Sequence, residues 1–217
     1  MSPHVKRFIT ASIIGTFFWL IFFYCPPYIF SITLFGILIT ILCKEWGKVF
    51  SINSLKFWAF MPFYPVLPFA LMIYMNQSDL YRPLIYYLFV LVFSFDAGAY
   101  VAGSLFGKRL IAPEISPKKT VEGFVGGYFS ALAIFVWALY DDKIYLSVSF
   151  ILLFSLAVCT IAFFGDLLES YLKRQANIKD SGELLPGHGG FLDRFDAVML
   201  TVFFFYAVKD WLIVYLH

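Results

Sequence analysis

Long apolar stretches alternate with short polar segments along the whole chain. The apolar stretches cover residues 8–24, 28–43, 57–75, 84–106, 123–140, 145–165 and 196–215. Most of them have the length, roughly 17–25 residues, that a helix needs to cross a bilayer. Pro26-Pro27 separates the first two stretches, and because proline cannot continue a helix, we expect these two to form a hairpin. The pattern predicts an all-α transmembrane bundle of about seven spans.

Composition supports this fold class. The chain is 61% hydrophobic and only 14% charged, and its mean hydropathy is +0.83, which is far from the average of soluble globular proteins. These values predict a multi-pass membrane protein surrounded by lipid, and they do not favour a nucleic-acid partner. We expect an N-terminal helical hairpin at 1–55, followed by a transmembrane region at 56–217 that carries the polar loops. Together they would form a single membrane domain.

Basic residues predict how the chain is oriented. If the N-terminus is cytoplasmic, one side of the membrane carries Lys6, Arg7, Lys44, Lys48, Lys56, Lys108, Arg109, Lys118, Lys119, Lys173, Arg174, Lys179 and Arg194. The other side carries only Arg82, Lys143 and Lys209. Cytoplasmic loops are enriched in Lys and Arg. We therefore expect both long polar loops, 107–122 and 166–196, to face the cytoplasm and the C-terminus to lie outside.

The second polar loop holds the densest set of charges. Charged residues close to a bilayer are costly and therefore indicate a functional site. If the sixth span continues as a helix past Gly165, Asp166, Ser170, Lys173 and Arg174 share one of its faces. Magnesium prefers oxygen ligands and usually binds one or two carboxylates together with water and phosphate. Asp166 and a second carboxylate, Asp193, could supply that pair.

Two further features favour phosphate binding. The segment 186–190 contains three glycines, whose bare backbone N–H groups can approach phosphate oxygens closely. In the first polar loop, Ser116-Pro117 reads as the cap and first residue of the fifth span. Such a helix N-terminus favours anions, and the three residues that follow carry side chains that can donate hydrogen bonds to a phosphate. These neighbours are Lys118, Lys119 and Thr120.

Two acidic side chains outside the second polar loop also need a role. We expect Glu122 to orient Lys119, although a place near the metal is also open. Asp96 lies within a span among small residues, where a carboxylate needs a partner or a polar cavity. It either lies beneath the site or makes a structural hydrogen bond.

The chain resembles a known family over about residues 60–215. Residues 170–196 read S-x-L-K-R-x4-K-D-x-G-x2-L-P-x-H-G-G-F-x-D-R-F-D, which is similar to the signature of the CDP-diacylglycerol synthases (phosphatidate cytidylyltransferases). The lead-in 165–170 and the blocks 96–108 and 115–123 also resemble that family. Many of its members have additional spans before the position equivalent to Phe60.

The resemblance implies that the phosphate of phosphatidic acid attacks the α-phosphorus of CTP, which yields CDP-diacylglycerol and pyrophosphate. It implies a magnesium ion, with room for a potassium ion, held by Asp166, Asp193 and Asp196. It also implies catalytic roles for Asp166, Lys173, Arg174, Asp193 and Arg194. Substrate binding falls to Ser116, Lys118, Lys119, Thr120, Ser170, Lys179, His188, Gly189 and Gly190. A homodimer in the bacterial inner membrane, with its active site facing the cytoplasm, is implied as well.

Two other functions stay open. A transporter with a charged re-entrant loop would also show intramembrane charge and glycine-rich breaks. Such transporters often contain two related halves, and this sequence has no visible internal repeat. A CDP-alcohol phosphotransferase would carry its aspartates in a D-G-x2-A-R run, and none occurs.

Overall fold

The computed structural model describes residues 3–185 and 189–216, with side chains from residue 12 to residue 215. The described part is largely helical, with one small sheet. Its elements are, in order, α1 (Pro3–Tyr24), α2 (Pro27–Thr40), η1 (Ile41–Glu45), α3 (Trp46–Val49), α4 (Leu55–Phe60), η2 (Pro62–Val66), α5 (Leu67–Asn76), α6 (Arg82–Phe106), β1 (Leu110–Ala112), β2 (Ser116–Thr120), α7 (Val121–Asp141), α8 (Val148–Gln175) and α9 (Leu192–Leu216).

Within residues 3–185 and 189–216, six helical segments are long and apolar enough to cross a membrane. They are Pro27–Val49, Leu55–Asn76, Arg82–Phe106, Val121–Asp141, Val148–Gln175 and Leu192–Tyr215. The chain is therefore an integral multi-pass membrane protein. The predicted first span falls within α1, of which Ser12–Tyr24 is a shorter apolar helix. A seventh crossing and a cytoplasmic N-terminus stay predictions.

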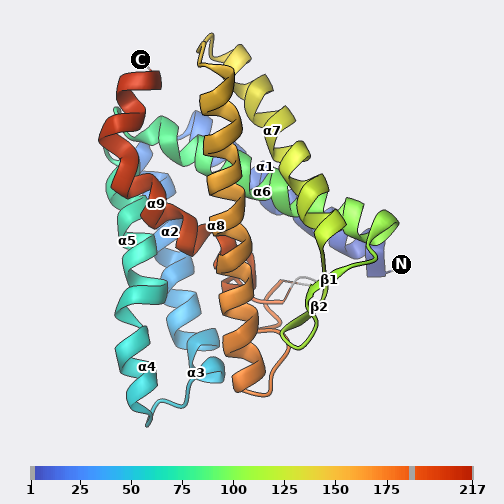
Figure 1. The fold of residues 1–217 in the computed structure, drawn as a ribbon. Helices are drawn as coiled ribbons and strands as arrows, with labels where there is room; N and C mark the ends of the chain where they lie inside the picture. Colours follow the sequence, from blue (N-terminus) through green and yellow to red (C-terminus); the bar gives the residue numbers. More distant parts are fainter. Residues whose placement is uncertain (1–2, 186–188, 217) are drawn as a thin grey trace.

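Two spans extend well beyond the apolar stretches that predict them, the stretches 28–43 and 145–165. The second continues to Val49 because the π-helical turn η1 joins α2 to α3 without a break. The sixth continues through Gly165 to Gln175, which confirms that the polar residues after Gly165 lie on a helix. Figure 1 shows that α8 extends lower than the start of α9.

The helices pack around a shared apolar core. Trp46, Phe69, Phe135 and Phe205, from four different segments, are almost completely buried. Helices α6 and α7 cross closely where small residues face each other. A Cβ added to Gly127 would lie only 2.7 Å from the carbonyl oxygen of Phe95, so a larger residue at this position would prevent such a close approach.

The connection between α6 and α7 differs from the prediction. Strands β1 and β2 form an antiparallel hairpin there, so the helix start predicted at Ser116-Pro117 is wrong. The cap of α7 is instead Thr120, whose Oγ1 accepts a hydrogen bond of 3.0 Å from the backbone N–H of Gly123. The sequence of β2 contains a valid cap-proline pair, and the pairing with β1 overrides it.

Candidate active site

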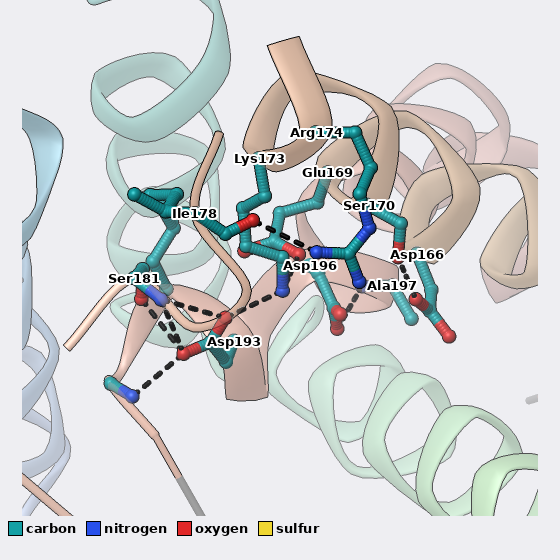
Figure 2. A network of polar contacts seen from close by, with 12 residues as sticks. Asp166, Glu169, Ser170, Lys173, Arg174, Ile178, Ser181, Asp193, Asp196 and Ala197 are labelled. Carbon is teal, nitrogen blue, oxygen red and sulfur yellow. Dashed lines mark hydrogen bonds and ion pairs between the residues drawn. The ribbon is translucent and has the colours of Figure 1, made fainter. Parts of the chain in front are cut away.

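The polar face predicted for α8 is present in the structure. Ser170 lies one turn after Asp166 and donates a hydrogen bond of 3.2 Å to its Oδ1. Lys173 and Arg174 follow on the next turn, and Figure 2 shows these side chains extending from the same helix into one polar network. The i, i+4, i+7, i+8 spacing therefore places them together, as expected.

Lys119 joins the two polar loops. Its Nζ lies 2.9 Å from Oδ2 of Asp166 and also donates a hydrogen bond of 3.3 Å to the carbonyl oxygen of Phe163. The ammonium group lies 4.6 Å from the ring centroid of Phe163, a cation–π distance. Only 13% of the Lys119 side chain is exposed, against 34% for Asp166. The hairpin β1–β2 is thereby attached to α8 beside a carboxylate that solvent can reach.

Arg174 makes a second contact between the loops. Its Nε donates to the carbonyl oxygen of Ile115 at 3.3 Å, and its Nη1 donates to the carbonyl oxygen of Ile178 at 2.8 Å. The guanidinium group remains exposed. In this arrangement Arg174 orders the turn after α8, and its predicted catalytic role is not tested by these contacts.

Helices α8 and α9 approach each other most closely at a glycine. A Cβ added to Gly165 would lie 2.9 Å from the backbone oxygen of Asp196 and 3.1 Å from the Cα of Ala197. The next residue on α8 is Asp166, so the close crossing places Asp166 beside the first turns of α9, which carry Asp196. Oδ1 of Asp196 accepts a hydrogen bond of 2.7 Å from the N–H of Ala197.

Lys173 lies in a buried ion-pair cluster. Its Nζ contacts Glu169 on the same helix and lies 2.6 Å from Oδ1 of Asp193 on α9. All three side chains are at most 10% exposed. Two carboxylates thus share one ammonium group away from solvent, which leaves Lys173 no exposed charge to offer a phosphate.

Asp193 is surrounded by donors. Besides Lys173, it accepts from the N–H and the hydroxyl of Ser181, both at 2.9 Å to Oδ2, and from the N–H of Gly190 at 2.7 Å. A carboxylate has about four lone-pair positions, so these contacts fill them. Figure 2 shows Asp193 and Asp166 at opposite ends of the network, with Lys173 and Glu169 between them. The expectation that Asp166 and Asp193 share one ion does not fit this arrangement.

Asp166 and Asp196 fit a divalent cation better. Both are partly exposed, both belong to the α8–α9 crossing, and the described contacts of Asp196 engage only one of its oxygens. Within residues 3–185 and 189–216, no group of three or more His, Cys, Asp or Glu side chains is arranged to hold a metal. Two carboxylates with water and substrate phosphate are nevertheless a usual set for magnesium.

The remaining predicted binding residues divide into two groups. Lys118, Lys179 and Arg194 are exposed, whereas Thr120 is buried and Ser116 is half-buried. Gly189 has a positive φ of 78°, which glycine adopts without strain. His188 lies outside the described residues.

The two acidic residues of uncertain role have distinct positions. Glu122 accepts hydrogen bonds from the backbone N–H groups of Lys108 and Arg109, at 3.0 and 3.1 Å. It therefore holds the turn between α6 and β1, and no contact with Lys119 is found for it in the described part. Asp96 lies on α6, and its place beneath the site stays a prediction.

Besides Glu169, sequence reasoning missed a second buried carboxylate. Glu45, at the end of η1, is 0% exposed and accepts hydrogen bonds from the N–H groups of Phe191 and Leu192 at 2.8 and 2.7 Å. Glu45 lies in the segment 1–55, for which the sequence predicted only an apolar helical hairpin. The sequence feature that could have revealed it is an acidic residue directly after the predicted span 28–43, between Lys44 and Trp46.

Comparisons with known proteins point to one family. The sequence model of the Cytidylyltransferase family matches residues 47–212. A protein of Bacillus subtilis named "Phosphatidate cytidylyltransferase" is 38% identical over 181 residues, which cover 81% of this chain and 66% of the relative. A protein of the same name from Haemophilus influenzae is 36% identical over 70% of this chain. Another from Rickettsia felis is 41% identical over 65% of this chain. The alignments cover 59% and 66% of those two relatives.

The chain therefore spans about two thirds or less of the length of these relatives. The family match begins at residue 47 and includes both polar loops. Nothing in these similarities favours a transporter.

Proposed function

Because the chain belongs to the Cytidylyltransferase family, we propose that it is a phosphatidate cytidylyltransferase. The reaction transfers CMP from CTP to phosphatidic acid and forms CDP-diacylglycerol and pyrophosphate. The observation that carries the proposal is the ion pair between Lys119 and Asp166. It joins the two polar loops into one partly exposed site at the end of the membrane helices.

In the proposed reaction, an oxygen of the phosphatidate phosphate forms a bond to the α-phosphorus of CTP. The bond between that phosphorus and the oxygen bridging to the β-phosphate breaks, and pyrophosphate leaves with the electron pair. A phosphate monoester has a second pKa of about 6 and is already a nucleophile near neutral pH. The site therefore needs no Ser-His-Asp or Cys-His arrangement.

Bringing two anions together is the main difficulty of this reaction. Positioning and fixed positive charge lower the barrier in phosphoryl-type transfers. The exposed bases Lys118, Lys179 and Arg194 are free of the buried ion-pair cluster, so we assign phosphate neutralisation to them. Lys173 holds Glu169 and Asp193 together instead.

We place the divalent cation at Asp166 and Asp196. When bound, magnesium would neutralise charge on the phosphates and align them for in-line transfer. Asp166 is itself oriented by Lys119 and Ser170, so the chain holds this carboxylate in a defined direction. A potassium ion, a homodimer and the cytoplasmic face of a bacterial inner membrane stay predictions from the resemblance and the charge distribution.

The test uses the full purified chain in detergent–lipid mixed micelles with labelled CTP, phosphatidic acid and magnesium. The proposal expects labelled CDP-lipid and an equal amount of pyrophosphate, both abolished by chelation of divalent ions. Pyrophosphate release without phosphatidic acid would indicate hydrolysis instead. No labelled lipid with any of magnesium, manganese or cobalt would refute the proposed function.

A further inference from the structure

Glu45 binds the start of α9 from a distant part of the chain. Its Oε1 accepts from the N–H of Phe191 at 2.8 Å, and its Oε2 accepts from the N–H of Leu192 at 2.7 Å. Oε2 also lies 3.2 Å from the hydroxyl of Ser181. The carboxylate is completely buried, so water does not compete for these contacts.

The local structure around Glu45 holds its side chain in this direction. Glu45 closes the π-helical turn η1, and such turns often occur at functional sites. The next residue, Trp46, is 0% exposed and donates from Nε1 to the carbonyl oxygen of Phe57 at 3.3 Å. Its ring also packs against Tyr64, with centroids 6.2 Å apart. The indole therefore anchors the backbone from which the Glu45 side chain extends.

Two glycines of the second polar loop make room for this carboxylate. A Cβ added to Gly190 would lie 2.5 Å from both Cδ and Oε1 of Glu45. A Cβ added to Gly182 would lie 3.2 Å from Oε1. The glycines thus allow Glu45 to reach backbone N–H groups, in addition to any role toward a phosphate.

Glu45 and Asp193 together occupy the N–H groups at the start of α9. Asp193 takes the N–H of Gly190, and Glu45 takes the next two, those of Phe191 and Leu192. Ser181 lies between the carboxylates, and since its hydroxyl has one proton it donates to only one of them at a time. Negative charge is favourable at a helix N-terminus. In this structure the chain itself supplies that charge.

We propose that Glu45 is a positioning residue for the reaction: it sets the first turn of α9 and thereby the placement of Asp196 opposite Asp166. Asp196 is four residues after Leu192, one helical turn along α9. A shift of the Phe191–Leu192 backbone would therefore rotate or translate Asp196 relative to α8. The inference rests on the proposed function for its catalytic consequence. Glu45 also lies before residue 47, where the family match begins, so the match does not assign it this role.

The central variant is Glu45→Gln, which keeps the shape of the side chain. Its amide oxygen can keep the hydrogen bond from one of the two backbone N–H groups, but its NH2 group cannot accept from the other. We expect kcat to fall about 10–100-fold, because small misplacements of reacting groups have effects of that size. The KM for CTP should stay within about threefold, since Lys118 and Lys179, two of the three bases assigned to phosphate, lie outside the turn that moves. Glu183→Gln, an exposed change in the same loop, is the matched control and should have wild-type kinetics.

A second measurement does not depend on activity. Hydrogen–deuterium exchange of the folded full chain should be faster at residues 189–196 in Glu45→Gln than in the wild type or Glu183→Gln. Exchange in the remote turn 141–147 should be the same in all three proteins. If Glu45→Gln does not fold, Glu45→Asp provides the same comparison, with the charge kept and the reach shortened.

The outcomes separate the inference from the proposed function. Faster exchange together with a lower kcat at similar KM supports the inference. Unchanged exchange at 189–196 overturns it, and so does faster exchange with an unchanged kcat, which would make Glu45 only a structural cap. A wild-type chain that forms no CDP-lipid refutes the proposed function and, with it, the catalytic consequence claimed for Glu45. The exchange comparison would still show whether Glu45 holds the turn.

Discussion

The ammonium group of Lys119 lies 2.9 Å from the carboxylate of Asp166, although the two residues come from different polar loops. Lys119 belongs to the hairpin between α6 and α7, and Asp166 belongs to α8. The pair is partly shielded from solvent, where an ion pair is stronger than at a fully exposed surface. It therefore orients the carboxylate to which we assign the cation.

Lys119→Met should impair catalysis more than binding. Loss of the cationic group that orients Asp166, the proposed metal ligand, is expected to lower kcat about 100-fold, because small misplacements of reacting groups have effects of that size. Lys119→Arg should recover part of the loss, because it restores the charge with a different shape. Steady-state kinetics with varied CTP would check this. Lys118→Met, an exposed neighbour, should mainly raise the KM for CTP, and equal effects of both methionine variants on kcat would contradict the distinction.

Lys173→Met should destabilise the protein. The substitution leaves the carboxylates of Glu169 and Asp193 buried without their shared cation, and breaking a buried pair in this way costs about 3–5 kcal/mol. Thermal unfolding in detergent would measure the change. Lys179→Met, which removes an exposed cation, should leave the unfolding temperature nearly unchanged. A stable but inactive Lys173→Met protein would instead support the catalytic role that the family resemblance implies.

The sequence was sufficient for the helices and for one polar face. Apolar length predicts the spans at 57–75, 84–106 and 123–140 to within a few residues, because lipid requires continuous apolar helices. Helical spacing also predicts that Asp166 and Ser170 meet. Both results depend on residues that are close in the chain.

The contacts that were missed join residues far apart in the chain. Glu45 precedes Leu192 by 147 positions, and Lys173 precedes Asp193 by 20. A periodic pattern shows which face a side chain occupies but not which distant helix end packs against that face. The strand β2 was missed for a different reason, since its stability comes from pairing with β1 and not from its own short sequence.

Asp196→Asn and Asp193→Asn should have different effects. If Asp196 holds the cation, Asp196→Asn should raise the magnesium concentration for half-maximal activity about tenfold or more. Asp193→Asn should lower the unfolding temperature, because Lys173 and Gly190 lose a charged acceptor. Its magnesium requirement should stay close to that of the wild type. A magnesium titration of both variants distinguishes the two roles. A large increase in the magnesium requirement of Asp193→Asn alone would show that Asp193, not Asp196, is the metal ligand.

Gly165→Ala should separate the two carboxylates of the proposed cation site. The added Cβ would lie 2.9 Å from the backbone oxygen of Asp196, so α8 and α9 must move apart at this crossing. Such overpacking costs about 1–3 kcal/mol, and the shift also increases the distance from Asp166 to Asp196. We therefore expect a modest loss of thermal stability. We also expect the magnesium concentration for half-maximal activity to rise tenfold or more, because poorly oriented ligands weaken metal binding by that much.

The matched control for this change is Gly36→Ala. Gly36 also lies inside a long helix, α2, but a Cβ there has no neighbour within 4 Å. Alanine is the better helix former, so stability should be equal or slightly higher and the magnesium requirement unchanged. If Gly165→Ala behaves like Gly36→Ala in both measurements, the close crossing does not set the cation site, because the helices would then tolerate a wider separation of Asp166 and Asp196.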